Sequence, residues 1–159
     1  MRAEAAAGVS PVISIRKAEI LDAGPLAELM IVLGYPTTEN EMEARLSLIL
    51  PRIDYLVAVA LSKEQVVGFI GAFIGDYLEM NGRVIALSVA SDHRGRGIGA
   101  CLLAHAEAWL RAGGAAICIV NSSSSRTDAH RFYRCEGSHT TGLRFQKDLQ
   151  SPGPLPASD

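Results

Sequence analysis

One short glycine-rich run constrains this chain more than any other segment. Residues 94–99 read Arg-Gly-Arg-Gly-Ile-Gly, between an apolar, strand-like segment and an amphipathic, helical one. Glycine lets the backbone pass close to a ligand, and the first turn of a helix leaves N–H groups without partners at the positive end of its dipole. Arg94 and Arg96 add charged donors there. The run therefore predicts a loop that binds an anion, typically a phosphate group.

Two other interpretations of the run have less support. Glycine-arginine turns also end ordinary surface loops, but the flanking strand and helix are the context that phosphate binding requires. Residues 95–100 also fit the pattern G-x-G-x-x-A of dinucleotide-binding proteins. That pattern requires an acidic residue at the end of the next strand, and the residues from Ile117 to Ser122 contain none.

The rest of the chain alternates between strand and helix patterns. Strands are predicted at residues 12–16, 55–61, 65–74, 83–90 and 115–120, with a final strand pair within 140–149. Helices are predicted at residues 23–33, from Thr38 to before Pro51, at 98–112, and from Ser125 or Thr127 to Arg134. The order predicts a single α/β domain with a mixed, mostly antiparallel central sheet flanked by helices, around one βαβ crossover.

Local signals refine this scheme. Asp22 is expected to cap the first helix and Gly34 to end it, while Thr38 and Glu41 form a capping-box pattern. Asn81-Gly82 indicates a turn, and the apolar run at 115–120 indicates a central, buried strand. The expected apolar stripe of the long helix consists of Ile98, Cys101, Leu102, His105, Ala106 and Trp109.

Composition excludes several classes of function. The 159 residues suit one domain, and a net charge of −2 gives no basic field for nucleic acid. No apolar stretch is long enough to span a membrane. The three cysteines are odd in number and lack metal-like spacing, which predicts reduced thiols, no metal and a cytoplasmic protein. We expect a flexible leader at 1–11, the domain at 12–149 and a disordered, proline-rich tail at 150–159.

Two motifs in this order resemble the GNAT superfamily of N-acetyltransferases, in particular its small bacterial-type subgroup. Residues 94–99 match the cofactor motif of that family, which is Arg or Gln, any two residues, Gly, any residue, and Gly or Ala. A second family signature consists of an Ala, any two residues, Phe-Tyr and a later Gly. Here it corresponds to Ala129, Phe132, Tyr133 and Gly137. The resemblance covers residues 12–149.

The resemblance implies transfer of an acetyl group from acetyl-CoA to an amine. It assigns the CoA pyrophosphate to Arg94, Gly95, Arg96, Gly97, Ile98 and Gly99. It assigns the pantetheine and the acetyl carbonyl to backbone groups of Leu87 and Val89, because the N–H of Val89 can polarise the carbonyl. Tyr133 is expected to protonate the leaving thiolate as a general acid.

This chain departs from the family in one respect that concerns the chemistry. Many members carry a Glu in the strand before the cofactor motif as general base, but residues 84–89 contain no acid. Asp76, Glu79 and Ser88 are weaker candidates, and the enzyme then relies on the neutral fraction of the amine. An alternative is a catalytically degenerate, CoA-binding sensor or interaction domain of the same fold, although Tyr133 argues against it.

The acceptor is expected to be a primary amine of a small molecule or a peptide. Contacts with it are expected from residues 33–36, from residues 76–79 and from Arg144. Acidic groups there suit a cationic amine such as a polyamine, an aminoglycoside or a lysine side chain, whereas a peptide N-terminus or a small amino acid fits equally well. Family members often dimerise through their late strands, so a homodimer is also an expectation.

Overall fold

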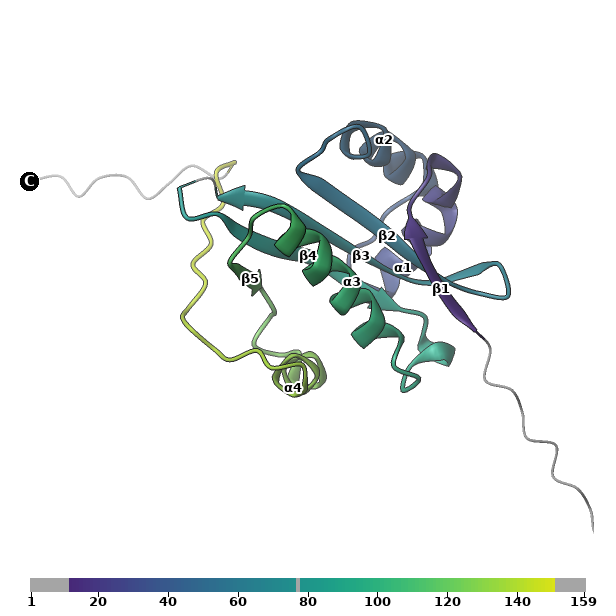
Figure 1. Ribbon diagram of the computed structural model, residues 1–159. Helices are drawn as coiled ribbons and strands as arrows, with labels where there is room; N and C mark the ends of the chain where they lie inside the picture. Colours follow the sequence, from purple (N-terminus) through teal and green to yellow (C-terminus); the bar gives the residue numbers. More distant parts are fainter. Residues whose placement is uncertain (1–11, 77, 151–159) are drawn as a thin grey trace, which may run out of the picture. The chain divides into compact units, whose positions relative to one another are not determined.

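The computed structural model of the chain describes residues 12–76 and 78–150 (Figure 1). The predicted leader, and residues 151–159 of the predicted tail, lie outside these residues. The chain divides into two compact units, residues 1–120 and 121–159. The first unit contains the sheet and the glycine-rich run, so most of what positions the candidate site belongs to it.

A five-stranded sheet forms the centre of the first unit, and its strands lie side by side in chain order. They are β1 (Ile13–Lys17), β2 (Tyr55–Ser62), β3 (Gln65–Asp76), β4 (Asn81–Val89) and β5 (Ile117–Val120). Neighbours run antiparallel except β4 and β5, which are parallel and are joined by the helix α3 (Ile98–Ala112). The predicted mixed, mostly antiparallel sheet with one crossover is confirmed.

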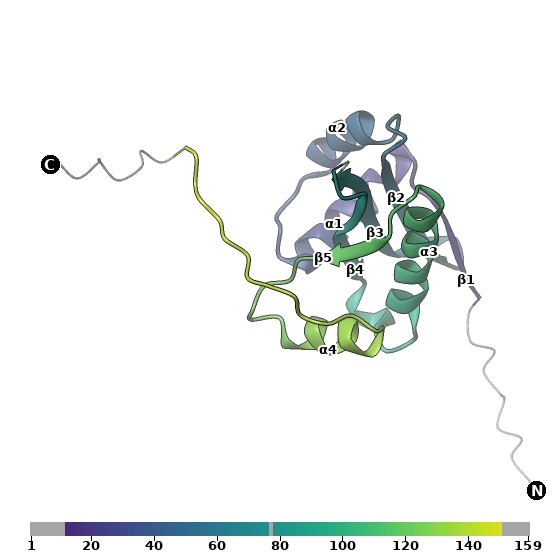
Figure 2. The ribbon, with the colours of Figure 1, turned by 60° about the vertical axis from the view of Figure 1, so that its left-hand side comes forward.

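Helices cover both faces of this sheet. α1 (Ala23–Leu33) and α2 (Glu39–Ile49) pack on one face, where Leu26 and Leu46 form a core with Val59 and Phe69. α3 lies on the other face, as Figure 2 shows. Its buried side chains are Ile98, Leu102, Leu103, Ala106 and Leu110. The predicted stripe was therefore wrong at Cys101 and His105, which are exposed, because the buried face is rotated around the helix towards Leu103 and Leu110.

The helix ends follow the local signals with one exception. The Thr38 hydroxyl accepts from the Glu41 N–H at 3.2 Å and the Glu41 carboxylate accepts from the Thr38 N–H at 2.8 Å, which confirms the capping box. Gly34 ends α1 in the left-handed region, at φ 97°. Asp22 precedes α1 as predicted, but its carboxylate makes no capping bond to that helix. It instead accepts two bonds from Arg16, at 2.7 and 2.9 Å.

A β-bulge interrupts β4 where the strand leaves β5. Gly71 of β3 pairs with Ala86 and Ala72 pairs with Val84, so Ile85 is an extra residue in β4. Pairing with β5 ends at Val84. The remaining part of β4, up to Val89, continues beside β3 alone.

Two predictions about the strands of the first unit were wrong. Asn81 and Gly82 begin β4, and the turn lies just before them at residues 78–80. β5 is the last strand in the sheet order, with Ile117 58% exposed. An apolar run identifies a strand, but it does not fix how many neighbours the strand has.

The second unit contains the helix α4 (Thr127–Cys135). Arg126 occupies its N-cap position, and no side chain caps the helix, so the predicted cap at Ser125 or Thr127 was wrong. The predicted final strand pair was also wrong, since residues 138–150 form no strand. Leu143 and Phe145 alternate as in a strand, but both are exposed, and alternation alone supplies no partner for the backbone bonds.

Within the part of the chain that the structure describes, no helix combines the length and the apolar character needed to cross a membrane.

The Arg16–Asp22 ion pair gives a prediction for stability. Burial raises the pKa of the Asp22 carboxyl, but bonds from Arg16 and from the Glu19 N–H outweigh it and leave the pKa below its usual value. The bonded carboxylate therefore contributes stability above its ordinary pKa, and this contribution is lost as the pH falls. We expect Asp22→Asn to lower the free energy of unfolding at pH 7 by about 2 kcal/mol in urea titrations.

The difference between Asp22→Asn and the parent protein should shrink below about pH 4, where the unfolded carboxyl becomes protonated. Asp54→Asn is the matched control, because the Arg52–Asp54 pair is more exposed and should contribute less. A difference for Asp22→Asn that stays the same at pH 3 would contradict this account.

Candidate active site

The open edge of β4 is the first component of the candidate site. The N–H of Ala90 donates to the carbonyl of Val67 in β3 at 2.8 Å. Because N–H and C=O groups alternate sides along a strand, the backbone groups of Val89 and Leu87 point away from β3. They point to the side where pairing with β5 has already ended. β4 thus offers a donor and an acceptor at each of these two residues.

The glycine-rich loop is the second component, and it follows β4 after one short 3-10 turn, Ser91–His93. Gly95 and Gly97 lie in the left-handed region, at φ 73° and 78°. A Cβ added at either residue would meet no atom within 4 Å, so only the backbone conformation and a possible ligand disfavour a side chain there. The Nε of Arg94 approaches the Val89 carbonyl at 3.4 Å and so links the loop to the open edge.

The start of α3 supplies free backbone donors. Gly97 is the N-cap of α3, and no side chain caps the helix there. The N–H groups of the first turn, from Ile98 to Ala100, therefore have no acceptor within the helix. The side chain of Ile98 is only 2% exposed and anchors this turn to the core. A fixed turn with free N–H groups at the positive end of a helix is suited to a phosphate.

The charges near the loop are mostly positive. Arg94 and Arg96 are exposed, whereas His93 bonds through Nδ1 to the Asp92 carboxylate at 2.9 Å. That bond from His93 is the largest cause of the lowered pKa of Asp92. The side chain of His93 is only 21% exposed and is engaged with Asp92.

Two of the sequence-based candidates for a general base have side chains that are engaged away from the open edge. The Ser88 hydroxyl is buried and donates to the Leu29 carbonyl of α1 at 3.0 Å. Glu79 precedes the first residue of β4 and bonds to Asn81 at 2.7 Å, so it lies roughly 25 Å along the strand from Val89. The side chain of Asp76 is outside the described residues.

Tyr133 and Arg144 belong to the second unit, residues 121–159. Tyr133 lies on α4, where its ring contacts the edge of the Phe132 ring at a centroid distance of 5.1 Å. In the same unit His130 bonds to the Ser123 carbonyl at 2.8 Å. The role of Tyr133 as a general acid therefore stays a prediction.

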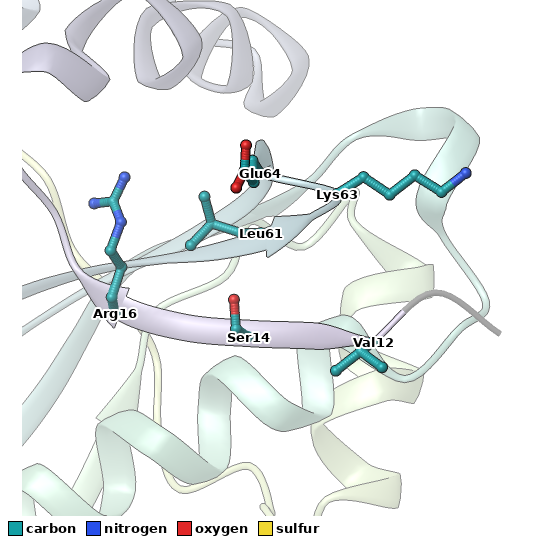
Figure 3. A pocket seen from close by; sticks show the side chains of 6 residues that line it. All are labelled: Val12, Ser14, Arg16, Leu61, Lys63 and Glu64. Atoms are coloured by element: carbon teal, nitrogen blue, oxygen red, sulfur yellow. The ribbon is translucent and has the colours of Figure 1, made fainter. Parts of the chain in front are cut away.

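A surface hollow at the other edge of the sheet is not part of this site. Figure 3 shows the side chains that line it, which are Val12, Ser14, Arg16, Leu61, Lys63 and Glu64. β1 is three strands away from β4, a separation of roughly 14 Å. The guanidinium of Arg16 is already bound to Asp22.

The bulge at Ile85 is the part of the site that sequence reasoning missed. A signal exists in the opposite strand, where Gly71 interrupts an apolar run. A Cβ at Gly71 would approach the Cγ1 atom of Ile85 to 3.2 Å, so the glycine makes room for the bulged residue. Glycine in a strand has several causes, however, and its partner is known only from the structure.

The open edge of β4 and the uncapped start of α3 together form a backbone surface that is suited to a ligand with a phosphate group. Comparison with protein families gives the same result, because the Acetyltransferase (GNAT) family matches residues 29–137. The chain therefore belongs to the GNAT family, and it is an N-acetyltransferase dependent on acetyl-CoA. This result supports the enzyme and gives no support to the non-catalytic alternative.

Individual relatives agree with the family assignment. The chain is 32% identical over 151 residues to an aminoalkylphosphonate N-acetyltransferase from Salmonella typhimurium, and the match covers 89% of this chain and 94% of the relative. A GNAT family acetyltransferase from Staphylococcus aureus is 25% identical, with a TM-score of 0.71 over 86% of this chain and 98% of the other. Aminoglycoside N-acetyltransferase AAC(6')-Iy in complex with CoA has a TM-score of 0.80 at 17% identity, covering 89% and 98%.

The glycine-rich loop gives a prediction for donor binding. In Gly97→Ala the new Cβ occupies the space through which a phosphate approaches the loop. We expect the dissociation constant of acetyl-CoA to rise about tenfold or more in isothermal titration calorimetry, the effect of losing one charge-assisted bond. The left-handed conformation should also lower stability by about 1 kcal/mol.

Gly114→Ala is the matched control. Gly114 lies just beyond the other end of α3, also in the left-handed region, at φ 92°. It should lower stability by a similar amount and leave acetyl-CoA binding unchanged. Equal loss of binding in both variants would show that backbone strain, and not the loop, controls affinity.

Proposed function

We propose that this chain transfers the acetyl group of acetyl-CoA to a primary amine of a small molecule, at the open edge of β4. The observation that carries the proposal is the continuity of this edge with the glycine-rich loop. A short connection of eight residues joins the backbone donors of β4 to the free N–H groups at the start of α3, and Arg94 within this connection bonds back to the Val89 carbonyl.

The residues of the first unit fit the donor. The loop from Arg94 to Gly99 would hold the pyrophosphate, because it combines free N–H groups, two exposed guanidinium groups and no obstructing side chain. Leu87 and Val89 would hydrogen-bond to the amides of the pantetheine arm, which would take the place of a neighbouring strand. The N–H of Val89 would donate to the acetyl oxygen as negative charge develops on it.

The transfer itself exchanges one bond for another. The neutral amine nitrogen attacks the acetyl carbon, an N–C bond forms, and the C–S bond breaks to release the thiolate of CoA. The amine proton passes to water, and the Tyr133 hydroxyl protonates the thiolate before it regains a proton from solvent. No side chain is assigned as base, because the Ser88 hydroxyl and the Glu79 carboxylate are engaged elsewhere. The rate should therefore follow the neutral fraction of the amine.

A small-molecule acceptor has more support than a peptide. The relative at 32% identity is an aminoalkylphosphonate N-acetyltransferase, and the structural neighbours include an aminoglycoside N-acetyltransferase. Both names describe small amines. Of the expected acceptor contacts, residues 33–36 connect α1 to α2 on the face of the sheet opposite α3, whereas residues 76–79 lie at the far end of β4.

Donor binding is tested by thermal unfolding with acetyl-CoA, CoA and NAD at 1 mM each. A ligand that binds only the folded state raises the melting temperature by mass action. We expect acetyl-CoA and CoA to raise it by several degrees and NAD to leave it unchanged. A protein whose melting temperature does not respond to acetyl-CoA would not have the proposed site.

The role of Tyr133 is tested by Tyr133→Phe, which removes only the hydroxyl. We expect kcat to fall about 100-fold, the usual contribution of a general acid, while the acetyl-CoA shift in melting temperature is retained. Release of free thiol from acetyl-CoA measures the rate. An unchanged kcat together with normal binding would remove Tyr133 from the mechanism.

A further inference from the structure

We propose that the acceptor amine carries an anionic oxygen group, a phosphonate or a carboxylate, and that Arg83 binds it. This inference rests on the proposed function and names the substrate class of the same site. It replaces the sequence-based expectation of a cationic acceptor, which depended on acidic residues at the turn 76–79. Arg83 and the residues around it all belong to the first unit.

The face of the sheet from which the acceptor arrives follows from the position of the donor. The donor loop opens directly into α3, which covers one face of the sheet. An amine must reach the acetyl carbon from a side that the donor leaves free. The acceptor therefore approaches on the opposite face, which carries α1 and α2.

Arg83 points to that acceptor face. A Cβ at its neighbour Gly82 would lie 2.5 Å from the Cδ2 atom of Leu110, so Gly82 faces α3. Successive residues of a strand face opposite sides, which turns Arg83 towards the face of α1 and α2. Arg83 is also paired in register with Phe73, whose ring stacks on Tyr55 at 5.1 Å.

The helices leave this part of the face uncovered. α1 covers the end of β4 at Ser88, but Ile85 of the bulge is 51% exposed. Gly71, opposite the bulge, contributes no side chain. Arg83 precedes Val89, whose N–H is assigned to the acetyl oxygen, by six residues, and the bulge leaves the two residues roughly 17 Å apart along the strand. An Arg83 side chain that extends along the strand would shorten this gap, so that a short amine with a terminal oxyanion could reach both the guanidinium and the acetyl carbon.

The charge of Arg83 has no partner within residues 12–76 and 78–150. On the same face, Arg16 is paired with Asp22 and Arg52 with Asp54. Arg45 donates to the Thr37 hydroxyl at 3.3 Å. Arg83 forms neither an ion pair nor a side-chain hydrogen bond in this part of the chain, although it is only partly exposed. A guanidinium in that position is suited to an oxyanion, which it binds with two parallel bonds.

Four short amines test the inference in the thiol-release assay: 2-aminoethylphosphonate, β-alanine, ethanolamine and 1,3-diaminopropane. The first two carry a phosphonate and a carboxylate, the third is neutral and the fourth is cationic. We expect kcat/KM for the better anionic amine to exceed that for ethanolamine by about tenfold or more, the effect of one charge-assisted bond. The ranking of the first two amines identifies the oxyanion.

The same assay is repeated with Arg83→Gln, Arg83→Lys and Arg111→Gln. We expect Arg83→Gln to lower kcat/KM for the anionic amine about 10- to 100-fold and to leave the value for ethanolamine within about twofold. Arg83→Lys should lose less activity than Arg83→Gln, because lysine keeps the positive charge but cannot donate the two parallel bonds of a guanidinium. Arg111→Gln removes an exposed charge in the last turn of α3 and should change neither value.

Three outcomes would overturn the inference. One is a parent enzyme that prefers ethanolamine or the diamine, which leaves the proposed function intact. Another is an Arg83→Gln enzyme, folded by its melting temperature, that loses activity equally with all amines. The last is no thiol release with any of the four amines, in which case the proposed function fails as well.

Discussion

The extra residue in β4 is the constraint on which the active site depends. The bulge at Ile85 directly follows Val84, the last residue of β4 that pairs with β5, and beyond it the backbone groups of Leu87 and Val89 point away from β3 with no paired strand on that side in the described residues. The bulge also reverses the sides of the strand, so that Gly82 faces α3 before it and Ser88 faces α1 after it. One inserted residue thus creates both the unpaired edge for the donor and the uncovered patch for the acceptor.

Sequence reasoning was most successful where a local cause acts within a few residues. The capping box of Thr38 and Glu41 and the end of α1 at Gly34 depend only on nearby backbone groups, and the structure confirms them. The glycine-rich run was placed correctly between β4 and α3 for the same reason. The family assignment followed from the spacing of two such local motifs, and the family comparison confirms it.

Features that depend on distant partners were not predictable. The carboxylate of Asp22 is close enough to cap α1 but binds Arg16, because a guanidinium brought in by β1 competes for it. β5 has the composition of a central strand and yet ends the sheet order. The unpaired charge of Arg83 is likewise invisible in the sequence, since it becomes apparent only when the other arginines of that face are seen with their partners.

The uncapped start of α3 has a consequence for the energetics of the whole enzyme. A capping side chain is worth about 1 kcal/mol to a helix, and Gly97 supplies none. In the proposed donor site a bound phosphate would take the place of that cap, so donor binding would stabilise the start of the helix. Stability of the folded protein and affinity for the donor would then depend on the same N–H groups. A change that capped α3 from within the chain would stabilise the unliganded protein and compete with the phosphate for these groups.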